Sequence, residues 1–172
     1  MYYLAIWMVH RLKRDINRLE RQAMEKTIKL SNHQKYASRL GGAKRFGVSQ
    51  IAGLSSELVG RASIFSQYAE QASSMSAMHN LQQLKMMGRV PITGNPMTQY
   101  QIEMSSLARF KEEAMKALKQ REVQYMNELE AEIEQELTSI ENQLSMKRAQ
   151  LKEYQELAKE RIQDAAPKFG LS

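Results

Sequence analysis

The chain contains no cysteine, which excludes disulfide bonds and zinc sites built from thiolates. Histidine is also rare. His10, His33 and His79 lie far apart in the sequence, and none belongs to a His-x-x-x-His or HExxH pattern. The GxSxG pattern of a nucleophilic serine is absent as well. We therefore expect no metal site, no cofactor, no small-molecule substrate and no catalytic residue, and hence a protein that is not an enzyme.

Glycine, proline and aromatic residues are scarce: the 172 residues include eight glycines, three prolines and 7% aromatics. No segment alternates β-branched or aromatic residues with polar ones between turn residues, so no β-strand is expected. Glutamate, lysine, glutamine, alanine, leucine and methionine dominate the second half, which is typical of long helices. The composition therefore predicts an elongated all-α protein. Such a chain buries little surface per residue, which favours self-association.

Long hydrophobic runs are missing except at the start, where Met1–Val9 reads MYYLAIWMV. As a helix this run is about 14 Å long, too short for a bilayer core of roughly 30 Å. Its basic residues follow the run, whereas those of a secretory signal precede it. We therefore expect neither a signal peptide nor a transmembrane helix, and a location in the cytoplasm or in an assembled particle. Three roles stay open for Met1–Val9: the buried start of a helix, docking to a partner, and contact with a membrane surface.

Residues 97–165 contain neither glycine nor proline and are expected to form one long helix, about 100 Å from end to end. A large aliphatic residue occurs at every eleventh position from Leu107. Since eleven residues make three turns, these side chains share one narrow stripe. From Ile133 onward a heptad pattern, typical of coiled coils, fits as well. The predicted coiled-coil interface comprises Leu107, Leu118, Leu129, Ile133, Leu137, Ile140, Leu144, Leu151 and Ile162.

The first helix is expected over residues 2–38, where Leu12, Ile16 and Leu19 follow a heptad spacing. Gly41 and Gly42 interrupt this pattern. Two glycines inside a helix cost about 2 kcal/mol relative to alanine, so we expect the helix to end there and a hinge to follow.

A second helix, rich in alanine, serine and glycine, is expected over residues 48–87. Ala52, Ser56 and Gly60 recur every four residues, and small side chains at that spacing let two helix backbones approach closely. Met75 and Met78 are expected among the apolar packing contacts of this helix.

The segment GRVPITGNP separates the second helix from the third. Gly88 can close a helix in a left-handed conformation, and Pro96 is acceptable in the first turn of the next one. A connection this short predicts an antiparallel helical hairpin. The hairpin is similar in architecture to helical subunits of bacterial secretion appliances and to phage structural proteins, which implies a component of a secretion apparatus or a virion. The chain is thus divided into a basic helix (1–40), a hinge (41–47), a small-residue-rich helix (48–88), a turn (89–96), a long coiled-coil helix (97–166) and a tail (167–172).

The net charge of +6 hides a division between a basic N-terminal third and an acidic C-terminal helix. No lysine or arginine lies between Glu122 and Lys147. The two regions can pair within the chain or between copies. The basic patch comprises Arg11, Lys13, Arg14, Arg18 and Arg21, and the acidic strip comprises Glu128, Glu130, Glu132, Glu134 and Glu136.

These patterns predict a structural or scaffold protein that forms a homo-oligomer or docks to other helical proteins through coiled-coil helices. The alternative is a nucleic-acid-binding protein, because a basic helix can bind phosphates without reading a base sequence. The stripe makes one expectation specific: Ile140→Asp should dissociate the assembly or unfold the C-terminal half, since it buries an unpaired charge.

Overall fold

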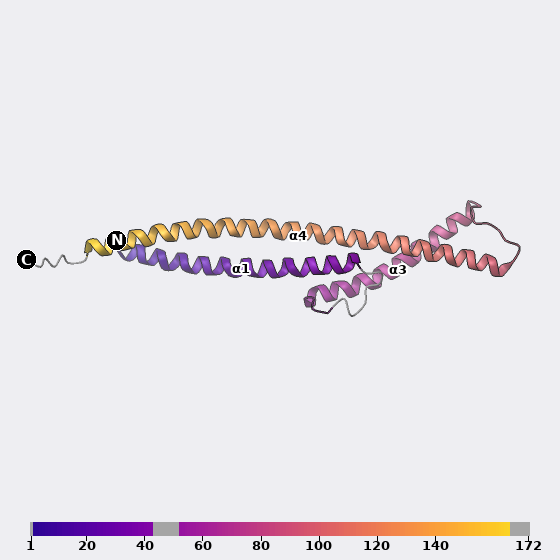
Figure 1. Cartoon of the computed structure of the whole chain (residues 1–172), viewed down its shortest axis with the longest axis horizontal. Helices are drawn as coiled ribbons and strands as arrows, with labels where there is room; N and C mark the ends of the chain where they lie inside the picture. Colours follow the sequence, from indigo (N-terminus) through magenta and orange to yellow (C-terminus); the bar gives the residue numbers. More distant parts are fainter. Residues whose placement is uncertain (1, 43–51, 166–172) are drawn as a thin grey trace, which may run out of the picture. The chain divides into compact units, whose positions relative to one another are not determined.

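The structure is a computed structural model that describes residues 2–42 and 52–165, with side chains from residue 3 to residue 161 outside the gap. Over these residues the chain is all-α, as its composition predicted, and contains no strand (Figure 1). The three helices are α1 (Tyr2–Gly42), α3 (Ser56–Met86) and α4 (Pro96–Ala165). None of these described helices combines the length and the apolar character that a bilayer crossing requires.

The contacts within the chain fall into two units. Unit 1 joins Met1–Ser31 to Ala131–Ser172, and unit 2 comprises Asn32–Glu130. Helices α1 and α4 contribute to both units, whereas α3 belongs to unit 2 alone. Each unit has its own apolar core.

Unit 1 is an antiparallel pair formed by α1 and α4 (Figure 1). Its core consists of Ile16 and Leu19 from α1 packed on Leu144 of α4, with Ile140 and Leu151 beside them. The heptad spacing of α1 explains this contact, because it keeps the buried leucine and isoleucine side chains on one face of the helix.

Three ion pairs flank the core of unit 1 and fix its antiparallel sense. Lys26 pairs with Glu136. Asp15 forms an ion pair with Lys147 at 3.6 Å, and Glu20 accepts a hydrogen bond from Arg148 at 2.7 Å. Asp15 and Glu20 near the start of α1 thus meet residues 147 and 148, whereas Lys26, further along α1, meets the earlier residue Glu136, as an antiparallel pair requires.

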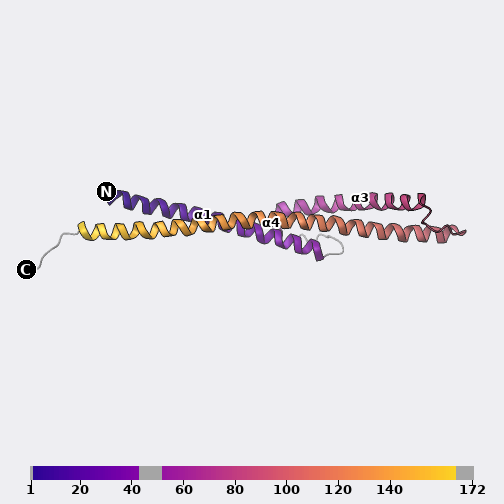
Figure 2. The ribbon, with the colours of Figure 1, turned by 90° about the horizontal axis from the view of Figure 1, so that it is seen from above.

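Unit 2 contains the predicted hairpin, in which α3 lies antiparallel to α4 (Figure 2). The buried face of α3 begins with Leu58, and small side chains line the rest of it. They are Ala62, Ala69, Ser73 and Ala77, spaced by seven and then four residues. Such short side chains allow the two helix backbones to come close.

The small residues that were expected to make this close approach are different ones, and that expectation was wrong. Ala52 precedes the helix, and Ser56 and Gly60 are exposed. No atom outside the helix lies within 4 Å of a methyl group built on Gly60. The small residues at positions 52, 56 and 60 therefore do not belong to the packed face of α3.

The boundaries of two helices differ from the expected ones. Helix α1 extends to Gly42, so Gly41 and Gly42 are its last two residues. Helix α3 begins at Ser56 instead of residue 48, because Gly53 has a φ of 79°, a conformation that a helix interior does not contain. The rest of the expected hinge, residues 43–47, and residues 48–51 lie outside the described residues.

The connection between α3 and α4 follows the predicted turn chemistry. Gly88 has a φ of 63°, and the Arg89 N–H donates to the Leu84 carbonyl at 3.0 Å, which closes the end of α3. At the start of α4 the Asn95 side-chain oxygen accepts from the Met97 N–H at 2.9 Å, with Pro96 as the first helical residue.

Candidate functional site

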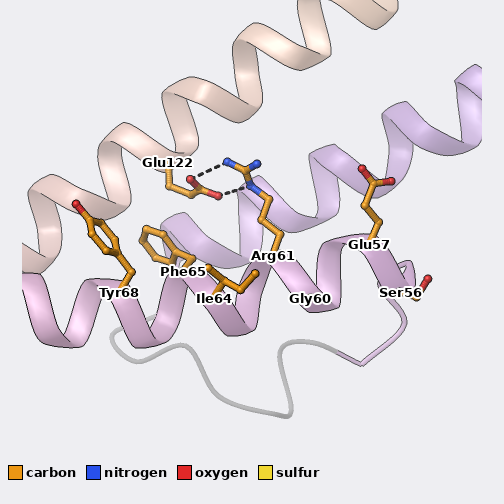
Figure 3. Close-up of a pocket in the computed structure, with 8 residues that line it drawn as sticks. All are labelled: Ser56, Glu57, Gly60, Arg61, Ile64, Phe65, Tyr68 and Glu122. Atoms are coloured by element: carbon orange, nitrogen blue, oxygen red, sulfur yellow. Dashed lines mark hydrogen bonds and ion pairs between the residues drawn. The ribbon is translucent and has the colours of Figure 1, made fainter.

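Three helices meet at Glu122 of α4 in unit 2. Arg61 of α3 donates to both carboxylate oxygens, from Nε at 2.5 Å and from Nη2 at 2.9 Å (Figure 3). The hydroxyl of Tyr36 on α1 donates to Glu122 Oε1 at 3.1 Å. The cluster lies over the apolar core in which Tyr36 and Leu40 pack against Met126.

Burial strengthens this cluster. The Glu122 side chain is only 12% exposed and the Arg61 side chain 34%. The Arg61 guanidinium also lies over the Tyr125 ring, 4.4 Å from the ring centroid, so the aromatic ring covers one face of the guanidinium. Burial, reinforced by the adjacent Glu122 carboxylate, raises the pKa of the Tyr36 hydroxyl far above its usual value. The hydrogen bond to Glu122 raises the pKa of Arg61.

The cluster joins all three helices through one bidentate ion pair and one hydrogen bond. Bidentate arginine–carboxylate pairs are geometrically specific, and this one fixes the register of α3 against α4. Its charged groups are engaged with one another and with the Tyr36 hydroxyl. A shallow groove beside it is lined by Gly60, Ile64, Phe65 and Tyr68 (Figure 3). Within the described residues, no three acidic or histidine side chains come together to hold a metal ion.

The predicted coiled-coil residues whose side chains the structure describes lie on one side of α4. Ile133 and Leu144 are buried, and the structure does not describe the side chain of Ile162. The others are half-buried: Leu107, Leu118, Leu129, Leu137, Ile140 and Leu151. The deepest α4 side chain is Met126, at 0% exposure. The described residues of the stripe, which recur every eleven positions, are thus only half-buried. The buried side chains of the packed face of α4 are Met126, Ile133 and Leu144.

The basic patch points away from the helix that α1 packs against. Arg11, Lys13, Arg14, Arg18 and Arg21 are all exposed. Arg18 makes a long contact of 3.9 Å with Asp15 on the same helix. The guanidinium of Arg11 lies 5.3 Å from the centroid of the Trp7 ring.

The acidic strip contributes one of the ion pairs between helices, through Glu136 and Lys26. Glu128, Glu132 and Glu134 are exposed, and Glu130 is half-buried. In unit 1 the other two pairs run the opposite way, with α1 supplying the carboxylates Asp15 and Glu20. The acidic strip thus meets a basic residue of the first helix, Lys26, which lies outside the basic patch.

Sequence reasoning missed the most distinctive exposed surface, which lies on α3. Its members follow one another at spacings of three or four residues on the side opposite the buried alanines, and none of them is charged. We call it the α3 outer line: Ile64, Tyr68, Gln71, Met75, Met78, Gln82 and Met86. Met75 and Met78 were expected in packing contacts, and that expectation was wrong. The sequence does contain a signal for this surface: a second set of apolar residues recurs at helical spacing, displaced by about two positions from the small residues.

The cluster at Glu122 was also missed. Its signals were the lone Arg61 in a helix of small residues and the position of Glu122 at the start of the acidic region.

No protein-family model, no curated protein and no solved structure matches the chain.

Proposed function

We propose that the protein is a non-enzymatic structural component that self-associates, and that two copies pair along the α3 outer line. One observation carries this proposal: a helix surface of five large apolar side chains, each 57% to 81% exposed, with no charge among them. The five are Ile64, Tyr68, Met75, Met78 and Met86.

The extent of the surface supports a helical partner. The line runs over 23 residues, roughly 33 Å of helix at about 1.5 Å per residue. Apolar side chains scattered singly on a surface need no partner, but a continuous exposed line of them marks an interaction site. Methionine suits such a site, because its flexible, polarizable side chain adapts to the surface that it contacts.

The composition of the line supports a second copy as the partner. A two-fold axis at Met75 brings Ile64 of one copy opposite Met86 of the other, with apolar or neutral side chains between them. Because no charge lies on the line, two copies do not repel each other when they pair in this way. A surface that is its own complement is what a two-fold dimer requires.

The test is size-exclusion chromatography coupled to light scattering, at low and at high salt. We expect a defined oligomer for the full-length chain, and a lower mass for Met75→Glu, because the pair would then bury two like charges at its centre. Since the line is neutral, high salt should leave the oligomer intact.

The matched control is Ser76→Glu, which adds the same charge to an exposed position of α3 outside the line. It should keep the mass of the unmodified chain. A monomer at both salt concentrations would refute self-association. An oligomer that Met75→Glu leaves unchanged would refute the α3 outer line as its interface.

A further inference from the structure

The side of α1 that faces away from α4 carries a row of residues spaced by three and four positions. It begins with two apolar side chains and continues with four arginines: Leu4, Trp7, Arg11, Arg14, Arg18 and Arg21. All six are exposed, with Leu4 at 66% and Trp7 at 50%. Since side chains at this spacing lie on one side of a helix, the row forms one continuous surface about 25 Å long.

The charges of α1 are divided between its two sides. Asp15 and Glu20 pair with Lys147 and Arg148 of α4, so these two carboxylates are engaged in contacts between the helices. On the row itself the arginines follow one another without an acidic residue between them. The surface is therefore strongly positive, and among the described residues only Arg18 of the four arginines has a carboxylate within 4 Å, that of Asp15 at 3.9 Å.

We propose that this row binds the surface of a membrane that carries anionic phospholipids. Arginine forms bidentate hydrogen bonds with phosphate, and basic residues near an anionic leaflet are attracted to it. Tryptophan prefers the level of the lipid headgroups, where its ring meets the acyl chains and its N–H stays hydrated. Leu4 and Trp7 supply the apolar contact, and the four arginines supply the contacts to phosphate.

The two apolar residues favour lipid over nucleic acid as the partner. A nucleic-acid backbone could occupy the arginines, but it would leave Leu4 exposed to water. A lipid surface uses both parts of the row. Attachment of this kind is peripheral, with the helix lying in the interface. It is compatible with the absence of a membrane-crossing helix among the described residues.

Trp7 is the only tryptophan of the chain, which makes it a direct probe. Full-length protein would be mixed with vesicles of phosphatidylcholine, with or without phosphatidylglycerol. Phosphatidylglycerol vesicles should shift the Trp7 emission to shorter wavelength, and brominated acyl chains should quench it. Phosphatidylcholine alone should do neither. An unchanged emission with both kinds of vesicle would overturn the proposal.

Vesicle sedimentation of variants then tests the residues. Arg14→Glu/Arg21→Glu should weaken binding at least about 30-fold, since each arginine removed from an anionic surface costs roughly a factor of five. Trp7→Ser should weaken it about tenfold by removing apolar contact. The control Lys116→Glu/Arg121→Glu makes the same change in net charge at exposed positions of α4 and should bind as the unmodified chain does.

Two further outcomes would overturn the proposal. In one, the control double variant loses as much vesicle binding as the α1 double variant, which would mean that net charge alone drives binding. In the other, a DNA or RNA duplex binds in place of vesicles, Arg14→Glu/Arg21→Glu abolishes that binding, and Trp7→Ser leaves it unchanged. The row would then be a nucleic-acid surface.

Discussion

At the scale of single residues, Glu122 is the side chain on which the packing of unit 2 depends. It accepts hydrogen bonds from α1 and from α3 while it belongs to α4. Its side chain is only 12% exposed, and both of its carboxylate oxygens have hydrogen-bond donors. Removing the charge therefore affects three helices at once.

We expect Glu122→Gln to lower the free energy of unfolding by about 1–2 kcal/mol, because the amide cannot accept two charged N–H groups from Arg61. The partial exposure of Arg61 keeps the loss below that of a fully buried pair. Urea denaturation followed by circular dichroism would measure it. The control, Glu113→Gln, breaks the exposed pair with Arg109 and should cost less than about 0.5 kcal/mol. Equal losses in the two variants would contradict the special role of Glu122.

Tyr36 gives the protein a predicted dependence on alkaline pH. Its pKa is raised in the folded state, so its contribution to stability is complete below the unfolded value of about 10. Above that pH the unfolded chain loses the proton while the folded chain keeps it, and stability falls as pH rises. Between pH 10 and 11, the Tyr36→Phe variant should lose less of its free energy of unfolding than the unmodified protein does, by up to about 1.4 kcal/mol. Parallel curves for the two proteins would show that Tyr36 titrates as an exposed tyrosine does.

At the scale of elements, α3 is a helix with two different faces. One carries the small residues Ala62, Ala69, Ser73 and Ala77 and packs within unit 2. The other is the α3 outer line. Small residues contribute little apolar area, so the hairpin relies on close backbone approach and on the ion pairs of Arg61, Glu70 and Lys85 with α4.

Ala69→Leu should destabilise unit 2 by about 1–3 kcal/mol, because Ala69 is 1% exposed and the larger side chain would push the helices apart. Thermal unfolding monitored by circular dichroism would show a lower midpoint. Ser63→Leu makes a comparable increase in volume at an exposed position of the same helix and should change the midpoint little. A tolerated leucine at 69 would mean that the hairpin is loosely packed.

At the scale of the whole molecule, the chain has two cores in place of one. Ile16, Leu19 and Leu144 form the core of unit 1, whereas Tyr36, Leu40 and Met126 belong to that of unit 2. Two cores that share no residue can respond separately to a local change.

Ile140→Asp tests this separation. Ile140 packs against the core of unit 1, so a carboxylate there should cost about 2–4 kcal/mol. Hydrogen exchange measured by mass spectrometry should rise in residues 2–31 and 131–161, and much less in residues 56–86. Asn142→Asp, at an exposed position of the same helix, should change neither region. A uniform rise over the chain would show that the two units unfold together.

Local sequence patterns are sufficient to predict the long helix and the turn before it. Residues 97–165 lack glycine and proline, Gly88 can adopt a positive φ, and Asn95–Pro96 starts a helix, all of which are local properties of the backbone. The heptad spacing of Leu12, Ile16 and Leu19 likewise determined which side of α1 is buried. Local rules were insufficient at residues 52–55, where the alanine- and serine-rich composition predicted a helix, whereas α3 begins at Ser56.

The tertiary structure alone decided which helices become partners. Periodicity identifies an apolar face but does not say what covers it, so the sequence left open whether α4 pairs with α1 or with a second copy. The structure pairs α1 with α4 in unit 1 and turns the arginines of α1 outward. It also brings Tyr36, Arg61 and Glu122 together across 86 positions of sequence. Contacts between distant residues depend on how the chain folds back, and no local pattern encodes that.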